Sequence, residues 1–375
     1  MSSVVHPQID SVFADGSAYA LIRTVDYRLA YRRYHLEFRR PVRTSHGLWT
    51  HREGVIVRLT GSDGVVRYGE AAPIPWFGTE TVDEVAEACA QLGEKVDDAR
   101  LDAVPEELGC LVNALRVART PAVDPANVAP RQIAALLPAG QAAMPLIEPL
   151  ADAGFRILKW KVGVGELTEE LGLLDELCGR LPSGAKLRLD ANGAWDRRTA
   201  QRWLERCAER PIEFVEQPCF AEPSAFAKAM ADKSQGTTEQ RKLEDLLLGL
   251  AQDFPTPLAL DESVIRAAHV ERWLDLGWPG FYVLKPSLLA DPVAVTAKLA
   301  AAKAKVVFSS ALETGVGAKA ALRTAFASTG EPFALGFGVW PLFALPELNG
   351  PTATPFVRWA DVSRINEEAV WNALN

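Results

Sequence analysis

A recurring unit in the second half of the chain constrains the fold most: a short apolar run ends at a charged or hydroxyl-bearing residue. The end residues are Lys161, Asp190, Glu216, Asp261, Lys285 and Ser309. They are separated by 29, 26, 45, 24 and 24 positions. One strand–helix unit takes roughly 30 residues, so the spacing predicts alternating strands and helices in a parallel sheet. The longest step fits one unit with a polar, exposed insertion at 232–241.

Two α/β architectures place strand ends differently. In a (β/α) barrel, the carboxyl ends of the strands converge on one mouth, where the chemistry lies. In an open doubly wound sheet, the ligand gathers at one switch point instead. Because a polar residue ends six successive predicted strands, the sequence favours the barrel over the open sheet.

The first part of the chain has another rhythm and indicates an α+β unit. Residues 20–38 alternate apolar with polar or basic side chains, which predicts a strand with one solvated face. Two further strands are expected at 54–59 and 65–69, joined by a turn in a hairpin or meander. Residues 41–51 are rich in turn formers and are predicted to be a loop.

Helices and a linker complete this first part. Apolar residues at helical spacing predict a helix near 82–92, with Thr79 or Thr81 as its N-cap. A second helix is expected over about 106–119. The proline-rich segment 121–130 is predicted to link this unit to the barrel.

Composition excludes several classes of function. The net charge of −8 leaves no basic footprint for nucleic acid, although an acidic protein can still bind a small anionic substrate through a local lysine cluster. Five cysteines without a CxxC motif argue against a disulfide framework or zinc site and favour a reducing cytoplasm. No apolar run of about 18 residues predicts a membrane span, and no signal peptide is recognisable.

Lys159-Trp160-Lys161 lies in an apolar, β-branched and aromatic run that predicts a strand. Side chains alternate along a strand, so the two lysines project to one face and Trp160 to the other. Two neighbouring ammonium groups inside an apolar run require compensating charge. An edge strand with two solvated lysines is the alternative.

Three carboxylates at the ends of three predicted neighbouring strands can meet one divalent cation. These are Asp190, Glu216 and Asp261. All-oxygen ligation suits Mg²⁺ or Mn²⁺. Each acid taken singly fits a strand-end turn or a helix cap better than a metal ligand. The recurrence of all three between lysines favours the metal site.

These motifs together resemble the enolase superfamily, in its muconate-lactonising-like branch. The residues that carry the resemblance are Gly69-Glu70-Ala71-Ala72-Pro73, Lys159-Trp160-Lys161, Asp190-Ala191-Asn192, Glu216-Gln217-Pro218, Asp261-Glu262-Ser263 and Lys285-Pro286. The resemblance covers about residues 20–345 and implies an α/β fold, a (β/α)₇β modified TIM barrel over 126–345. It also implies an α+β capping domain over 1–125, to which 346–375 returns.

The resemblance implies roles for the site residues. Asp190, Glu216 and Asp261 match the Mg²⁺ ligands, and Lys161 and Lys285 match the two catalytic lysines. The family removes a proton α to a substrate carboxylate, so Lys161 is the expected base and Lys285 the cation that steadies the developing charge. A free lysine has a pKa of ~10.4, which is too high for a base at neutral pH. Lys159, as a neighbouring ammonium, is expected to lower that pKa.

Within the branch, the resemblance is closest to members that are hydro-lyases, carbon–oxygen lyases of quinone biosynthesis. They dehydrate 2-succinyl-6-hydroxy-2,4-cyclohexadiene-1-carboxylate to 2-succinylbenzoate, on the route to menaquinone or phylloquinone. The alternatives are N-acylamino-acid racemisation, cycloisomerisation, and a non-catalytic metal-binding relative. Dipeptide epimerases of the branch carry an Asp-x-Asp motif near the last strand, and residues 335–341 contain none.

Further residues are weaker candidates. Asn192 and Glu262 are expected to orient the metal ligands. Trp76 and Phe77 are expected in packing between the two units. Residues after the predicted strand at 305–308 are candidates for the succinyl group, with a helix-capping turn as the alternative: Ser309, Ser310, Glu313 and Gly315. Loop residues that would close over the substrate, with a plain surface loop as the alternative, are Ser45, His46 and Trp49.

Overall fold

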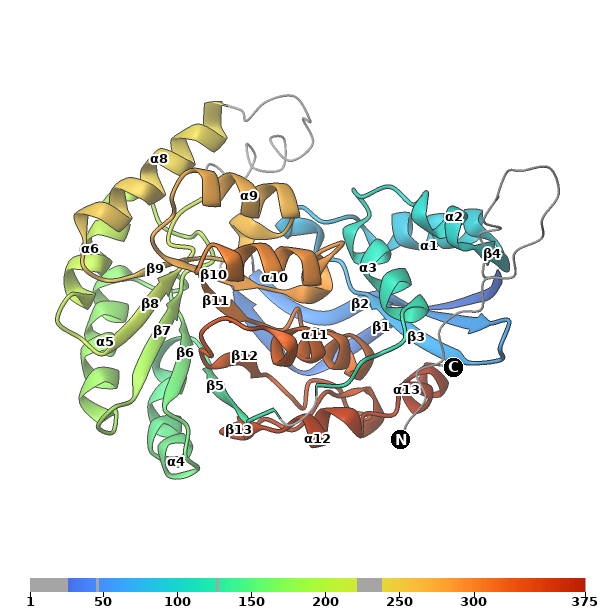
Figure 1. The fold of residues 1–375 in the computed structure, drawn as a ribbon. Helices are drawn as coiled ribbons and strands as arrows, with labels where there is room; N and C mark the ends of the chain where they lie inside the picture. Colours follow the sequence, from blue (N-terminus) through green and yellow to red (C-terminus); the bar gives the residue numbers. More distant parts are fainter. Residues whose placement is uncertain (1–25, 45–46, 126–127, 221–237, 375) are drawn as a thin grey trace.

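The computed structural model describes residues 26–44, 47–125, 128–220 and 238–374. Figure 1 shows two parts side by side, a barrel of strands ringed by helices and a long curved sheet with its own helices, here called the cap. The strands of the cap are β1 (Asp26–Thr44), β2 (Gly47–Gly61), β3 (Val66–Ala71) and β4 (Lys95–Asp97). They pair antiparallel in the order β3-β2-β1-β4.

The prediction of a loop at 41–51 is wrong, because β1 and β2 continue into a hairpin there. After an irregularity between Glu37 and Val42, pairing resumes with Val42 opposite Trp49. Pro41 is tolerated at this point because a bulge leaves it outside the regular ladder. Turn formers indicate only local preference, whereas the pairing depends on the opposite strand. The start of the predicted strand, 20–25, lies outside the described residues.

Three helices cover one face of the cap sheet: α1 (Val82–Leu92), α2 (Asp98–Asp102) and α3 (Gly109–Arg119). The predicted N-cap of α1 is confirmed at Thr81, whose hydroxyl accepts from the Glu84 amide in a capping box. The second predicted helix begins at Gly109 rather than near 106. The close contact of α3 with β3 requires glycine at 69, where a Cβ atom would lie 1.9 Å from the carbonyl oxygen of Ala114.

The predicted parallel sheet is confirmed as a barrel of strands. These are β5 (Arg131–Leu137), β6 (Ile157–Lys161), β7 (Lys186–Asp190), β8 (Ile212–Glu216), β9 (Leu258–Leu260), β10 (Phe281–Leu284), β11 (Lys305–Phe308) and β12 (Leu335–Gly338). Neighbours in this order pair in parallel from β5 to β11, and β12 pairs with β5. A parallel bridge between Ser309 and Gly336 joins the β11 and β12 sides and closes the ring.

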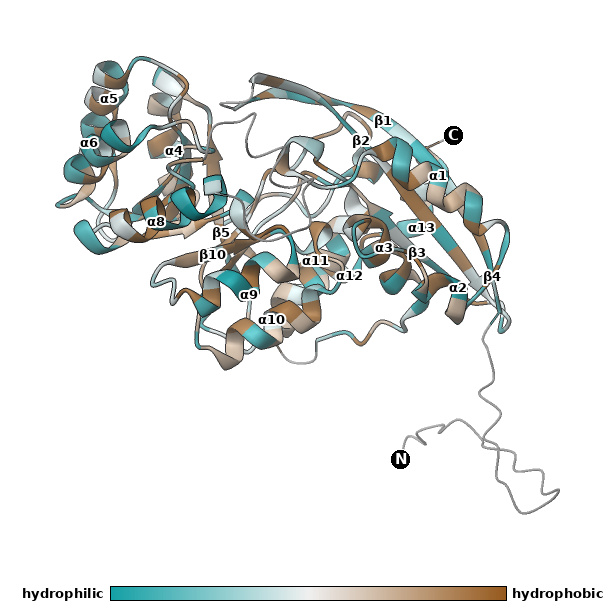
Figure 2. Cartoon of the chain, turned by 90° about the horizontal axis from the view of Figure 1, so that it is seen from above, coloured by the Kyte–Doolittle hydropathy of each residue, from teal (hydrophilic) through white to brown (hydrophobic). Residues whose placement is uncertain are grey.

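Helices alternate with these strands and form the outer layer (Figure 1). They are α4 (Ile147–Asp152), α5 (Leu167–Arg180), α6 (Arg197–Cys207), α8 (Thr238–Asp253), α9 (Ala267–Asp275), α10 (Pro292–Ala301) and α11 (Gly315–Ala327). Figure 2 shows hydrophilic and hydrophobic residues alternating along them, as expected for helices with one face on the strands and one in solvent. Of the predicted insertion, 232–237 lies outside the described residues and 238–241 begins α8.

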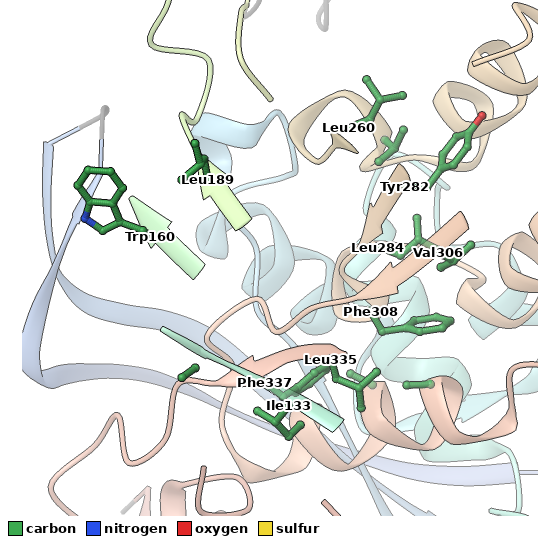
Figure 3. Close-up of a cluster of buried hydrophobic side chains, with 14 of the residues drawn as sticks. Ile133, Trp160, Leu189, Leu260, Tyr282, Leu284, Val306, Phe308, Leu335 and Phe337 are labelled. Atoms are coloured by element: carbon green, nitrogen blue, oxygen red, sulfur yellow. The ribbon is translucent and has the colours of Figure 1, made fainter. Parts of the chain in front are cut away.

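The main core fills the space between strands and outer helices, where Figure 3 shows the outward-pointing side chains of the barrel strands. Trp160 is fully buried there, with its ring centroid 6.4 Å from that of Trp203 on α6. The prediction that Trp160 faces the helical layer is therefore confirmed. Phe214 and Phe281 belong to a separate buried cluster and lie 4.8 Å apart.

The chain ends beside both parts. Strand β13 (Phe356–Val357) pairs antiparallel with β5, and helices α12 (Trp359–Ser363) and α13 (Glu367–Ala373) follow. The guanidinium of Arg32, on β1, lies 4.4 Å from the ring centroid of Trp371, on α13. In the ranges that the structure describes, we find no helix with the length and apolarity needed to span a bilayer.

Candidate active site

Strand register brings the charged residues together at one mouth of the barrel. Lys161 lies opposite Asp190, and Asp190 lies opposite Glu216 on the next strand. Asp261 and Lys285 directly follow β9 and β10. Side chains alternate along a strand, so Asp190 and Glu216 share a face with Arg188 and Phe214, two positions earlier and deeper in the barrel.

Ion pairs connect the lysines to the acids. Lys159 Nζ lies 2.6 Å from Glu216 Oε1 and 2.8 Å from Asp190 Oδ2. Lys161 Nζ lies 2.6 Å from the same Asp190 oxygen, and Lys285 pairs with Asp261. The charge that the two neighbouring ammonium groups require therefore comes from the acids of β7 and β8, which excludes the solvated edge strand.

Burial and neighbouring charge shift the pKa values in opposite directions. Burial works to lower the pKa of Lys159, but the Asp190 and Glu216 carboxylates outweigh it and hold that pKa above its usual value. Burial works to raise the pKa of Asp190, yet Lys159 and Lys161 hold it well below its usual range. For Glu216, burial followed by the Asp190 charge raises the pKa to about 7. Neighbouring charge thus favours the ammonium form of Lys159 in this arrangement, with the acids as its counter-ions.

The acids form a donor set that fits a hard divalent cation. Asp190, Glu216 and Asp261 are each at most 3% exposed, and all offer oxygen. The ammonium groups of Lys159 and Lys285 lie against these oxygens and partly neutralise the carboxylates. Such buried carboxylates need a cation for compensation, which supports a metal site at this point.

Two further buried polar residues, Asn192 and Glu262, lie beside this set, and their role in orienting the metal ligands stays a prediction. Asn192 adopts a left-handed backbone conformation with φ of 44°. Its Oδ1 accepts from Lys161 Nζ at 2.6 Å, and its Nδ2 donates to Glu262 Oε1 at 2.8 Å. The other oxygen of Glu262 is buried without a hydrogen-bond partner in the described ranges, which leaves an acceptor open beside the acids.

Gln217 is a site residue that the sequence analysis missed. It is fully buried with φ of 37°, and its Oε1 accepts from the amide of Asp261 at 3.1 Å. Its Nε2 donates to the Ser263 hydroxyl at 2.9 Å. Gln217 thereby fixes the segment that carries Asp261. Its place in Glu216-Gln217-Pro218 was the available signal.

A cavity opens above the acids, between the barrel mouth and the cap. Lys159, Lys161, Asp190, Asp261 and Lys285 line its floor. Its walls are mostly apolar and include Val42, Trp49, Ile74, Trp76, Phe77, Leu136, Leu312 and Val339. The charged floor and apolar walls suit a small carboxylate with a hydrocarbon ring.

The structure divides the weaker candidates from the β11–α11 segment. Ser309 and Ser310 line the cavity. Glu313 and Gly315 are buried and do not line it, because the chain turns inward before α11 begins. The expectation that these two contact the succinyl group is therefore wrong.

The candidates from the cap have different outcomes. Trp49 lines the cavity, whereas Ser45 and His46 lie outside the described residues. Trp76 and Phe77, expected in packing between the two parts, form part of the cavity wall as well. The Phe77 ring lies 5.0 Å from Lys285 Nζ, so the cap contributes directly to the surroundings of a site lysine.

Three other metal-ligating side chains meet on the exposed face of the cap: His35, His51 and Glu53. The two imidazole rings are stacked, with centroids 4.1 Å apart and an angle of 19°. Lone pairs of nearly parallel rings do not converge on one ion, and Arg33 lies 3.5 Å from Glu53. In this arrangement the group does not fit a cation.

Comparison with known proteins adds independent findings. A family model described as enolase C-terminal domain-like matches residues 145–354. The o-succinylbenzoate synthase of Thermosynechococcus vestitus is 39% identical over 333 residues, covering 87% of this chain and 97% of the relative. The o-succinylbenzoate synthase of Thermobifida fusca is 28% identical over 299 residues, covering 79% and 77%.

Solved structures agree with these matches. The crystal structure of o-succinylbenzoate synthase from Thermosynechococcus elongatus, complexed with magnesium in the active site, has a TM-score of 0.71 and 37% identity. It covers 88% of this chain and 96% of that chain. A dipeptide epimerase from Cytophaga hutchinsonii has a TM-score of 0.70 at 20% identity, covering 88% and 89%, which shows a shared fold.

Proposed function

The chain belongs to the enolase superfamily, and on that premise we propose that it is a Mg²⁺-dependent hydro-lyase with o-succinylbenzoate synthase activity. It dehydrates 2-succinyl-6-hydroxy-2,4-cyclohexadiene-1-carboxylate to 2-succinylbenzoate, a step of menaquinone or phylloquinone biosynthesis. The observation that carries the proposal is the 39% identity along nearly the whole length of a relative with this activity in its name. The lysines and acids at the barrel mouth agree with it.

Lys161 is the proposed base. It removes the proton from the ring carbon that carries the carboxylate, and the same ammonium group then returns a proton to the departing hydroxyl. One C–H bond and one C–O bond break, water leaves, and the ring becomes aromatic. Because one group serves both steps, proton and hydroxyl leave from the same face. The bond to Asn192 Oδ1 at 2.6 Å holds Lys161 Nζ in place for both transfers.

Lys285 and Lys159 supply fixed positive charge. Lys285 directly follows β10, and Lys161 is on β6. Strands β7, β8 and β9 lie between β6 and β10, so the two lysines approach the cavity from different sides. Lys285 stays an ammonium because Asp261 pairs with it. Bound through Asp190, Glu216 and Asp261, Mg²⁺ supplies positive charge for the substrate carboxylate.

Several other assignments form part of the proposal. Residues 1–125 with 346–375 act as a capping domain, and 126–345 form the catalytic barrel. The protein acts in the cytoplasm on a small carboxylate, without nucleic acid or membrane partners. Racemisation of N-acylamino acids uses the same lysines and is the competing reaction. Gly336, Gly338 and Val339 line the cavity at β12, and none of them offers a carboxylate for a substrate ammonium group.

A dehydration assay tests the function. The aromatic product has an ultraviolet absorbance that the substrate lacks, so turnover is read directly with Mg²⁺ and with excess chelator. We expect Lys161→Ala to lose at least about 10³-fold in kcat with an unchanged circular dichroism spectrum. The matched control is Lys186→Ala, which removes an exposed lysine at the opposite end of β7 and leaves activity intact.

Three results would contradict the proposal. Full activity of Lys161→Ala, or of the wild type in chelator, is incompatible with the proposed base and metal. Exchange of the α-proton of an N-succinyl amino acid in D₂O, without dehydration of the cyclohexadiene, would favour racemisation instead.

A further inference from the structure

One wall of the substrate cavity is irregular backbone rather than a helix or strand. Residues 309–312, between β11 and α11, all line the cavity. Leu312 has φ of 60°, a left-handed conformation that a leucine rarely adopts. Such a conformation persists only where surrounding contacts hold it.

The polar groups of this wall are hydrogen-bonded within the protein. Ser309 Oγ donates to the Gly336 carbonyl at 3.3 Å. Ser310 Oγ donates to Glu313 Oε2 at 3.0 Å and accepts from the Leu312 amide at 2.9 Å. The Ala311 amide donates to the same Glu313 oxygen. With its hydroxyls and these amides bonded within the protein, the wall presents mainly apolar surface to a ligand.

Glu313 is the centre of this arrangement. It is fully buried, and it lies behind the wall rather than in the cavity. Its Oε1 is buried without a hydrogen-bond partner among residues 26–44, 47–125, 128–220 and 238–374. Burial above all, opposed by its own backbone amide and reinforced by the Glu70 charge, raises the pKa of Glu313 to about 7. Burying this carboxyl group is energetically unfavourable, yet the group accepts hydrogen bonds from two donors of the cavity wall, the Ser310 hydroxyl and the Ala311 amide.

A residue of the cap, Glu70, fixes the first turn of α11. Glu70, on β3, accepts from the amides of Thr314 at 2.9 Å and Gly317 at 2.8 Å, at the start of α11. A Cβ atom on Gly317 would lie 2.8 Å from Glu313 Cγ and 3.1 Å from Glu70 Oε2. The two carboxyl side chains therefore pack close together against the first turn of α11, and α11 cannot shift without disturbing Glu313.

We propose that Glu313 is a positioning residue for the dehydration, which orders residues 309–312 as an apolar, substrate-shaped wall without touching the substrate. The inference rests on the proposed function for its reaction and on the hydrogen bonds above for its mechanism. The lysines and metal-binding acids lie on β6, β7 and β8 or directly after β9 and β10, and depend on other contacts. Loss of Glu313 therefore weakens substrate binding more than it slows the chemical step.

The test compares Glu313→Ala and Glu313→Gln with the wild type in the dehydration assay. Alanine frees the Ser310 hydroxyl and the Ala311 amide, so we expect KM to rise about tenfold or more while kcat changes less than about threefold. Glutamine retains a carbonyl oxygen that accepts from both donors, so we expect it to restore KM. Ser310→Ala removes one of the two donors and serves as a second variant, with a smaller rise in KM, if Glu313→Ala does not fold.

Glu80→Ala is the matched control, because Glu80 is also a buried carboxylate that accepts from two donors, the amides of Cys110 and Leu111. It lies away from the cavity, so its loss should lower Tm without changing KM. An unchanged KM in Glu313→Ala would overturn the inference. So would a glutamine variant as impaired as alanine, or an equal rise of KM in the control.

Hydrogen exchange separates this inference from the proposed function. We expect faster amide exchange at residues 309–317 in Glu313→Ala, with or without substrate. A wild type that does not dehydrate the cyclohexadiene refutes the function, while exchange still reports whether Glu313 orders the wall. Unchanged exchange at these amides refutes the ordering role itself.

Discussion

Glu70 gives the sharpest prediction about how the cap is held on the barrel. It is 4% exposed, and its carboxylate accepts from Tyr34 Oη at 2.6 Å and from the amides of Thr314 and Gly317. The Thr314 hydroxyl is a fourth donor. A carboxylate is also favoured at the N-terminus of α11 by the helix dipole. One side chain thus joins β1, β3 and α11.

The cost of removing it follows from these donors. In Glu70→Ala, four donors lose their acceptor in a buried place, each at a cost of about 1 kcal/mol at the low end. We therefore expect the free energy of unfolding to fall by about 4 kcal/mol. In Glu70→Gln, the amide nitrogen faces two of the donors and the carbonyl oxygen still serves the others, so the expected loss is about 2 kcal/mol.

Urea unfolding, followed by tryptophan fluorescence and far-ultraviolet circular dichroism, measures both losses. The matched control is Glu84→Ala, which removes an exposed carboxylate from the capping box of α1 and should cost about 1 kcal/mol or less. If Glu70→Ala costs no more than Glu84→Ala, the four hydrogen bonds do not hold the cap as argued. Separate fluorescence and dichroism transitions would show that cap and barrel unfold independently.

Three further predictions concern protonation and packing. Because the pKa of Glu313 rises from 4.5 to about 7 on folding, its protonated form stabilises the protein below pH 4.5, and we expect about 3 kcal/mol of that stability to be lost by pH 7. The difference in urea unfolding between wild type and Glu313→Gln should show this dependence, and a difference that is constant with pH would contradict it. Burial, then Arg266, lowers the pKa of His269 from 6.5 to about 4, so its contribution is present above pH 6.5. We expect this contribution to the free energy of unfolding to fall by about 3 kcal/mol as the pH is lowered to 4. Urea unfolding of the wild type and of His269→Gln across this pH range measures it. Gly69→Ala should lower the free energy of unfolding in urea by at least about 1–3 kcal/mol, because the new Cβ atom would overlap the Ala114 carbonyl. The control is Gly172→Ala, where nothing lies within 4 Å of the added Cβ atom. An equal loss of stability in this control would show that packing is not the cause.

The sequence by itself determined the barrel and the contents of its mouth. Strand ends are encoded locally, as apolar runs that stop at Lys161, Asp190, Glu216, Asp261 and Lys285. In a parallel barrel these ends must meet at one mouth, so spacing alone was enough to bring them together. Alternation along β6 likewise placed Trp160 against the helices and the lysines in the cavity.

Only the tertiary structure decided what surrounds that mouth. The hairpin that carries Trp49 exists because two strands pair, and its own residues indicate only turns. Glu70 meets Thr314 across 244 positions of sequence, and no local pattern records such a contact. Glu313 looked like a ligand contact because it follows a strand end, but the chain turns inward there and buries it. Buried hydrogen bonds between distant segments fix these features, and they form only once the cap and barrel lie together.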